Sequence, residues 1–445
     1  MRKTIVPPVA IAYNPRSRTP LANAFANSGT QRVRRPFLPL LLLFAYLAAP
    51  GIGLAQMSFI EAGYFGDVEE TLVWAYWLHA TIVFGLTWWL CARNVRGAVL
   101  TAAVDLPKYS VERSGQLLLA ALIILFAMGG ARILFFGEDR GDLRISFGAA
   151  GFIYTWLQLY LTPFLIAVVA YLHSLRGRTV GRRALVVYAM GLFIGIMSGY
   201  KFTTVIIFMP ALTIALPKLR VAHMAGLFAI SICILLVTEH MQSDRQFDEA
   251  IAYLIARATE VSAYGPITTW SEFANDGVSI QRFLESSVLI LGSKIGSLFL
   301  NFQENSVEYL RFNLGRYLTY LYYPNADAAL SGAVNITLTV FGEAVAFFGG
   351  GLFWIWSILT GIFSGSVLRR YSRALQKGDI ATAALWLVYF FSVLLSWINS
   401  SGWINLIALP IVVGMLALRL VARWLRILQI NTSTDSMPAQ RGVNA

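Results

Sequence analysis

The stretch FLPLLLLFAYLAAPGIGLAQ, at residues 37–56, decides the fold. It carries no charged side chain, and a helix of this length is long enough to cross the hydrocarbon layer of a bilayer. Because the run exceeds the apolar core of a usual signal peptide and follows a long basic segment, we expect a retained membrane span rather than a cleaved leader. Apolar runs of comparable length recur along the chain as far as residue 422.

These repeated runs dominate the 445 residues, of which 57% are hydrophobic. Runs this long do not alternate as the strands of a membrane barrel do, so helices are the spanning form that satisfies the backbone in lipid. We predict an all-α polytopic membrane protein with about ten transmembrane helices. The expected spans are residues 37–56, 71–92, 115–136, 150–173, 184–199, 202–217, 221–240, 346–367, 380–399 and 403–422.

Charge is divided between the loops on the two sides of these spans. If each run crosses once, one side holds 25 of the 35 basic residues and only 4 of the 23 acidic residues. The other side holds the remaining 10 basic and 19 acidic residues. Since loops rich in Lys and Arg stay in the cytoplasm, the basic side is inside and both termini are cytoplasmic. The net charge of +12 therefore reflects topology, and we expect no nucleic-acid partner.

Three parts follow from this layout. Residues 1–36 hold basic residues but no acid, together with several Pro, Ser and Asn residues, and predict a disordered cytoplasmic tail. Residues 37–426 form the membrane domain, and residues 427–445 form a second cytoplasmic tail.

One large external loop interrupts the membrane domain at residues 241–345. Loops this long are usually functional and carry structure of their own. Apolar residues at helical spacing predict short helices within 246–263 and 303–323. Residues 284–302 are more apolar, and we expect an interfacial or re-entrant helix there, because a full span would place the basic loop after 367 outside.

Motifs for nucleotide or metal chemistry are missing from the sequence, which has no GxGxxG, P-loop, HExxH or nucleophile elbow. The four histidines are scattered, and each is more readily interpreted as a packing residue than as a metal ligand. Cys91 and Cys233 both fall in expected spans and are interpreted as small apolar packing residues. We therefore expect neither a metal nor a cofactor.

Cationic residues on the otherwise acidic external side are the first candidates for chemistry. The positive-inside rule disfavours cationic residues on this side, whereas the binding of a diphosphate would require them. Arg offers a planar fork to phosphate oxygens, and Lys offers a point charge. Local pairing is the alternative: Arg282 precedes Glu285 by three residues, and Arg311 follows Glu308 by three. The residues concerned are Arg132, Lys201, Arg245, Arg257, Arg282, Arg311 and Arg316.

A carboxylate at the external membrane boundary is the second candidate. Glu343 lies in NITLTVFGEAVAFFGGGLFWIW (335–356), where a Gly-Glu pair precedes a glycine-rich apolar segment. Such a group can orient a hydroxyl or act as a general base. The alternative is an acid that is favoured by the dipole at the start of a helix.

Three short strings connect these candidates to a known family. They are SGYKFTTVIIFMP (198–210), IARATEVSAYG (255–265) and FGEAVAFFGGGLF (341–353). The first is similar to a small-residue stretch that ends in a basic residue in the Wzy-type O-antigen and exopolysaccharide repeat-unit polymerases, with Lys201 where Arg is more usual. The second resembles that family's loop segment with an Arg on a helix, and the third its Gly-Glu string followed by an aromatic-glycine turn. The likeness in layout covers residues 37–426.

The resemblance implies an inverting glycosyltransferase of the bacterial inner membrane that acts at the periplasmic face. Its substrates would be oligosaccharide repeat units linked to undecaprenyl diphosphate, and its further partners would be the lipid bilayer and a chain-length regulator membrane protein. Cationic side chains would stabilise the diphosphate leaving group, and Glu343 would deprotonate the attacking hydroxyl. The catalytic residues implied are Glu343, Arg257 and Lys201, and the substrate-binding residues are Arg132, Arg245, Tyr264, Arg311 and Arg316.

Other classes of function remain open. A lipid-linked oligosaccharide flippase or other transporter would need pseudo-symmetric halves, and the irregular loop lengths argue against them. Another polyprenyl-phosphate-dependent membrane glycosyltransferase or ligase would carry external acids early in the chain, for which EDRGD (138–142) is the candidate. A non-catalytic membrane scaffold is a further alternative.

Overall fold

The computed structural model describes residues 36–57, 68–92, 109–130, 132, 151–176, 182–197, 201–215, 247–291, 293–300, 302–303, 306–331, 335–376, 379–399 and 402–434. All regular structure in these ranges is helical, which confirms the predicted all-α class. Within the same ranges, six helices are long and apolar enough to cross a membrane, as expected of a multi-pass membrane protein. They are Phe37–Met57, Glu70–Ala92, Val111–Gly130, Gly151–His173, Ile380–Asn399 and Trp403–Leu425.

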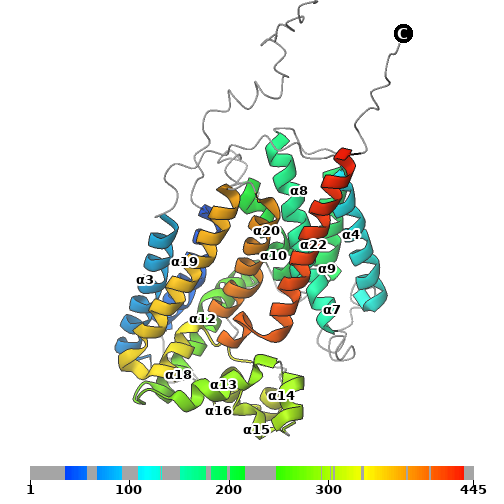
Figure 1. The fold of residues 1–445 in the computed structure, drawn as a ribbon. Helices are drawn as coiled ribbons and strands as arrows, with labels where there is room; N and C mark the ends of the chain where they lie inside the picture. Colours follow the sequence, from blue (N-terminus) through cyan, green and yellow to red (C-terminus); the bar gives the residue numbers. More distant parts are fainter. Residues whose placement is uncertain are drawn as a thin grey trace, which may run out of the picture.

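A bundle of roughly aligned helices forms the body of the molecule (Figure 1). Three of them contain π-helical turns, labelled η2, η4 and η7. The elements of the bundle are α2 (Phe37–Met57), α3 (Glu70–Ala92), α4 (Tyr109–Leu125), η2 (Phe126–Gly130), α7 (Gly151–Trp156), η4 (Leu157–Leu161), α8 (Thr162–Arg176), α9 (Arg182–Met197), α10 (Lys201–Ala215), α18 (Val340–Leu352), α19 (Trp354–Gln376), α20 (Ile380–Val388), η7 (Tyr389–Leu394), α21 (Leu395–Asn399), η8 (Trp403–Leu406) and α22 (Leu409–Thr434).

The remaining expected spans fare differently from these six. Residues 184–199 and 202–217 correspond to α9 and α10, which are helices of 16 and 15 residues. The span expected at residues 221–240 lies outside the described residues. The total of about ten crossings therefore stays a prediction.

Charged side chains gather at the two ends of the bundle. At one end, Arg183 at the start of α9 pairs with Glu112 near the start of α4, and Arg113 lies 6.0 Å from the ring centroid of Trp424 in the second half of α22. At the other end, Glu69 precedes α3. This division agrees with the alternation of charge along the sequence, and the orientation of the chain in the membrane stays a prediction.

Helix α19 packs in parallel along α3, and the two lie side by side in Figure 1. The contact is close because Gly361 faces α3, where an added Cβ would lie 2.9 Å from the Cβ of Leu86. Two polar contacts cross it: His79 Nδ1 and Ser357 Oγ are 2.8 Å apart, and Thr87 Oγ1 donates to the carbonyl of Gly361 over 3.2 Å. In lipid, where apolar burial gives helices little reason to associate, such small residues and hydrogen bonds hold them together.

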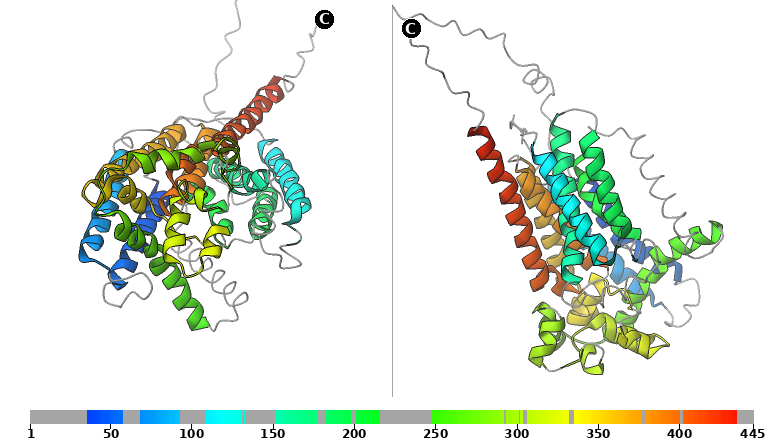
Figure 2. Two further views of the ribbon diagram at one scale, coloured as in Figure 1. Left: turned by 90° about the horizontal axis from the view of Figure 1, so that it is seen from below. Right: turned by 90° about the vertical axis from the view of Figure 1, so that its right-hand side faces the viewer.

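The external loop folds as a set of helices below one end of the bundle (Figure 2). The predicted short helices are present, but their bounds differ from the expected ranges, because the first helix continues ten residues further and the apolar segment 284–302 divides into several pieces. The elements are α12 (Phe247–Phe273), α13 (Ile280–Ser287), the 3₁₀ turn η6 (Val288–Leu291), α14 (Ser293–Leu300), α15 (Val307–Leu310), α16 (Leu314–Tyr322) and α17 (Ala326–Ser331).

The single span expected at residues 346–367 is wrong in its bounds, because the structure divides it into α18 and α19. The backbone leaves helical geometry at Gly349, whose φ is +69°. A Cβ at Gly349 would lie 1.9 Å from the carbonyl oxygen of Asp276, so glycine is required for this approach of the external loop. Gly350 then donates its N–H to the carbonyl of Ala274 over 2.9 Å. The break therefore joins α18 to the loop.

The α3–α19 contact gives a test of the packing. Gly361→Val should destabilise the protein, because the new side chain enters space held by Leu86 and by the backbone of Val83, 3.1 Å from the Cβ position. Overpacking of this kind costs ~1–3 kcal/mol. Thermal unfolding of the purified protein in detergent should show a lower Tm. Gly85→Ala in α3 is the control, since no atom lies within 4 Å of its Cβ position, and an equal loss in both variants would contradict the contact.

Candidate functional site

Glu343 occupies the first turn of α18 and is almost completely buried, with 2% of its surface exposed. The helix begins there because Thr339 caps it, accepting a hydrogen bond from the N–H of Gly342 over 3.4 Å. A carboxyl group buried at a membrane boundary is costly unless hydrogen-bond donors replace the lost water. The partners of this group therefore decide what it does.

Both carboxyl oxygens of Glu343 accept hydrogen bonds, one from the end of the span Ile380–Asn399 and one from the start of the span Trp403–Leu425. The indole Nε1 of Trp397, in α21, donates to Oε2 over 2.6 Å. The backbone N–H of Trp403, at the start of η8, donates to Oε1 over 2.5 Å. No basic side chain pairs with Glu343 among the described residues. The carboxylate therefore binds segments that are distant in the sequence. An acid that only interacts with the dipole at the start of its own helix would not make these hydrogen bonds.

Aromatic rings enclose the donors. Phe283 of α13 stacks on Trp403, with ring centroids 4.8 Å apart and an interplanar angle of 8°. Trp356 of α19 meets Trp397 edge to face at 6.3 Å and Trp403 likewise at 6.3 Å. The indole of Trp403 also donates to Ser286 Oγ over 3.0 Å. The external helix α13 is therefore part of the wall around the carboxylate.

Arg282 anchors α13 to the helix that carries Glu343. Its guanidinium donates to the carbonyl of Ala346 over 3.2 Å, three residues beyond Glu343. It also pairs with Asp276 at 2.5 Å and lies 4.1 Å from the ring centroid of Phe273. The local pairing expected between Arg282 and Glu285 is wrong, because Asp276 takes that place.

A second cation, Arg311, reaches the same external helix through Glu285. The two side chains pair at 2.8 Å, so the expected partner Glu308 is wrong as well. Partial burial raises the pKa of the Glu285 carboxyl, but hydrogen bonds from Gln281 and Arg311 outweigh it and leave the pKa below its ordinary value. The Arg311 side chain is 64% exposed, so its charge is available at the surface beside α13.

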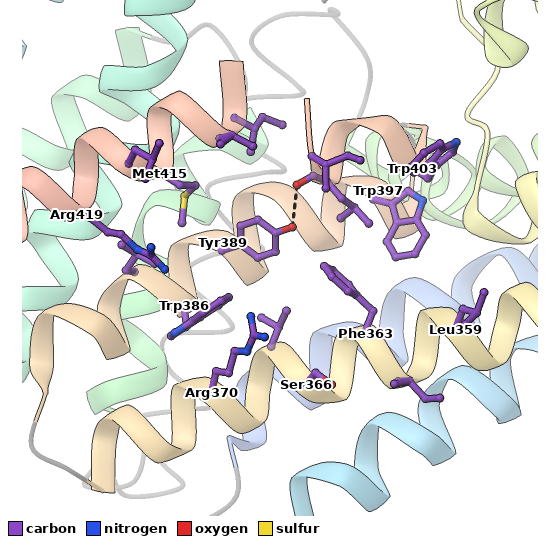
Figure 3. Close-up of a pocket in the computed structure, with 18 of the residues that line it drawn as sticks. Leu359, Phe363, Ser366, Arg370, Trp386, Tyr389, Trp397, Trp403, Met415 and Arg419 are labelled. Carbon is purple, nitrogen blue, oxygen red and sulfur yellow. Dashed lines mark hydrogen bonds between the residues drawn. The ribbon is translucent and has the colours of Figure 1, made fainter. Parts of the chain in front are cut away.

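A groove of about 660 Å³ runs along the bundle between α19, the α20–α21 segment and α22 (Figure 3). Trp356, Trp397 and Trp403 line one end of it, and Arg370 and Arg419 line the other. Most of the wall between them is apolar or aromatic. Glu343 lies behind two of the tryptophans rather than in the groove itself, so any group that it serves directly must first displace an indole or an N–H donor.

The structure brings only part of the expected site together. Glu343 and Arg311 lie at or beside the enclosure described above. Arg316 belongs to a local contact, donating to the carbonyl of Leu330 over 3.2 Å and lying 5.0 Å from the ring centroid of Tyr309.

The other candidates lie elsewhere or outside the described part. Arg132 is exposed beyond η2. Tyr264 lies half-buried in α12, where burial and the neighbouring Glu260 raise the pKa of its hydroxyl. Arg257 in α12 and Lys201 at the start of α10 have side chains outside the described part, and Arg245 lies outside it altogether. Their proposed roles stay predictions.

The residues that hold Glu343 were not predicted as site residues. Trp397 and Trp403 bracket the string INSSG at 398–402, a short polar turn between two apolar runs. Such a turn, with a tryptophan on each side and on the same side of the membrane as the Gly-Glu pair, is the signal that would have pointed to them. It does not reveal that an indole N–H and a backbone N–H meet one carboxylate.

Comparison with known proteins finds no match. No protein-family model matches the chain, and neither a curated protein nor a solved structure is significantly similar to it.

The two hydrogen bonds to Glu343 can be tested separately from the aromatic packing. Trp397→Phe keeps a ring in place but removes the N–H, and leaves one oxygen of a buried carboxylate without its donor. An unsatisfied buried group costs ~1–3 kcal/mol, more when charged, so Tm should fall clearly. Trp386→Phe, elsewhere in the same groove wall, is the control and should change Tm less. Equal shifts would mean that ring size alone matters.

Proposed function

We propose that the chain polymerises oligosaccharide repeat units carried on undecaprenyl diphosphate, at the periplasmic face of a bacterial inner membrane. The product would be an O-antigen or an exopolysaccharide. The observation that carries the proposal is the buried carboxylate of the Gly-Glu string, held by Trp397 and Trp403 at the facing ends of the last two spans and covered by an external helix that carries Arg282. The resemblance of the strings around Lys201, Arg257 and Glu343 supports the same class.

The reaction itself needs three things from the protein. The acceptor hydroxyl oxygen attacks the anomeric carbon of the donor sugar, and the bond from that carbon to the diphosphate oxygen breaks. The hydroxyl proton passes to a base, and the electron pair leaves with the lipid diphosphate. A carboxylate can accept the hydroxyl proton, and fixed cations can stabilise the negative charge on the leaving diphosphate. Flat apolar surfaces can orient the sugars.

Cations near the enclosure match the charge of the leaving group. Arg311 is exposed, and its pair with Glu285 is of the surface type, which is worth only ~0–1 kcal/mol, so a diphosphate can compete for it. Arg282 is 30% exposed and fixed by Asp276 and Ala346, which suits a group that holds α13 in place. Lys201 and Arg257 are the further cations that the proposal assigns to the diphosphate.

Glu343 acts in two stages in this proposal. With both oxygens engaged, it first positions Trp397 and Trp403, whose rings offer apolar faces to a sugar. It reaches an acceptor hydroxyl only when the turn at Gly402 moves aside. That turn is close, since a Cβ at Gly402 would lie 3.4 Å from Oε1 of Glu343. A chain-length regulator membrane protein is a further partner under this proposal.

The size of the glycan product tests the class of function. A strain that lacks the gene should accumulate single repeat units on lipid, and complementation should restore long chains. Surface glycans and lipid-linked intermediates, resolved by gel electrophoresis and mass spectrometry, distinguish the cases. Repeat units that stay on the cytoplasmic leaflet would instead indicate a flippase, and the role of the external carboxylate in transfer would fall.

Glu343→Gln tests the role of the carboxylate. The side chain keeps its size, but it loses the base and one of its two acceptors, so long chains should decrease by on the order of 10²–10⁴-fold at normal protein level. Glu272→Gln is the matched control, an external acid that accepts hydrogen bonds from Tyr317 and Tyr322. Should Glu343→Gln polymerise normally, the carboxylate has no part in the reaction.

A further inference from the structure

The groove between α19 and α22 has a length suited to a lipid chain. Trp356 and Arg370 both line it from α19, fourteen residues apart, which corresponds to about 21 Å of helix. This is most of the thickness of the hydrocarbon layer. Between these ends the groove is apolar except for Ser366 and Tyr389, and the hydroxyl of Tyr389 donates to the carbonyl of Leu406 over 2.9 Å.

The rims of the groove are formed by exposed apolar side chains. Leu359 and Ile362 on α19 are 50% and 45% exposed, although both line the groove. Val412 and Leu416 on α22 form the opposite rim and are 41% and 50% exposed. A lipid chain can therefore enter sideways from the membrane, without passing through water.

Two cations close one end of this apolar groove. Arg370 comes from α19 and Arg419 from α22, and Figure 3 shows both beside Trp386. Arg370 lies 4.9 Å from the ring centroid of Trp386, which holds its guanidinium over the groove. Neither arginine pairs with a carboxylate among the described residues. Two uncompensated guanidinium groups at the end of an apolar groove are complementary to an anionic lipid headgroup.

We propose that this groove is a binding site for an anionic glycerophospholipid of the cytoplasmic leaflet. Its phosphate lies between Arg370 and Arg419, and one acyl chain follows the groove toward Trp356. The occupant is not the lipid-linked sugar, because the charge division places these arginines at the cytoplasmic end, opposite Glu343. A polyprenyl chain that entered the groove from the Glu343 end would place its apolar terminus against the two arginines. The site does not depend on the polymerase proposal.

Lipid preference of the purified full-length protein tests the site. Native mass spectrometry in detergent would compare phosphatidylglycerol with phosphatidylcholine of the same acyl chains. Two guanidinium groups at the headgroup should favour phosphatidylglycerol by on the order of tenfold. Arg370→Gln combined with Arg419→Gln should abolish the preference, and Arg370→Lys combined with Arg419→Lys should keep most of it.

The controls separate this site from the general charge of the basic end. Arg373→Gln combined with Arg423→Gln removes two exposed arginines of the same helices that do not line the groove, and the preference should survive. Ser366→Trp fills the middle of the groove and should reduce binding of both lipids.

Three results would overturn the proposal. The first is an equal loss of preference in the control pair. The second is an unchanged preference in the Arg370→Gln, Arg419→Gln pair. The third is tighter binding of a polyprenyl phosphate than of phosphatidylglycerol to the native protein, if that binding is lost when Arg370→Gln is combined with Arg419→Gln.

Discussion

The hydrogen bonds from Trp397 and Trp403 to Glu343 are the interaction on which the external end of the structure depends. They join the first turn of α18 to α21 and to the start of η8, which lie 54 and 60 residues further along the chain. In a bilayer, two helices that meet through apolar side chains alone gain little over contact with lipid. A buried carboxylate that accepts hydrogen bonds from two N–H donors provides a directional interaction, which compensates for the weak hydrophobic driving force between helices in lipid. Its cost is recovered only when both donors are present, so the arrangement specifies one position for the last two spans.

Backbone approach is the second constraint, and glycine permits it. Gly349 lets the loop at Asp276 touch α18, and Gly265 lets α12 touch the segment before α18, where an added Cβ would lie 1.9 Å from the carbonyl of Thr337. These contacts fix α12 and α13 against the helix that carries Glu343. Arg282 then adds a charged side chain to the same junction. The glycine contacts and the hydrogen bonds of Arg282 therefore hold α13 at this junction together.

Much of the fold could be predicted from the sequence, because the length of an apolar span and the charge of a loop depend only on the residues within that segment. Six of the expected spans correspond to helices long enough to cross, and Glu343 was singled out from its string. The bounds of the span at 346–367 were wrong because the backbone conformation of Gly349 depends on its contact with Asp276, 73 residues earlier in the chain. The ion pairs were wrong for a similar reason: Glu285 has Arg282 three residues away in sequence, yet Arg311 reaches it across the fold. Local spacing predicts helices well and long-range partners poorly.

The two ends of the groove show how one charge division can serve two purposes. Positive residues that orient the chain in the membrane need only be inside, and their exact positions on a helix are free. Arg373 and Arg423 satisfy that requirement without touching the groove, whereas Arg370 and Arg419 come from two different helices and line the same end of it. Topology alone does not require such convergence. Acids dominate the far end, where Glu343, the one buried acid of the described part, is satisfied by N–H donors instead of cations. At the basic end, the groove itself contains cations that can pair with a phosphate group. At the acidic end, the exposed cations lie outside the groove, in the external loop.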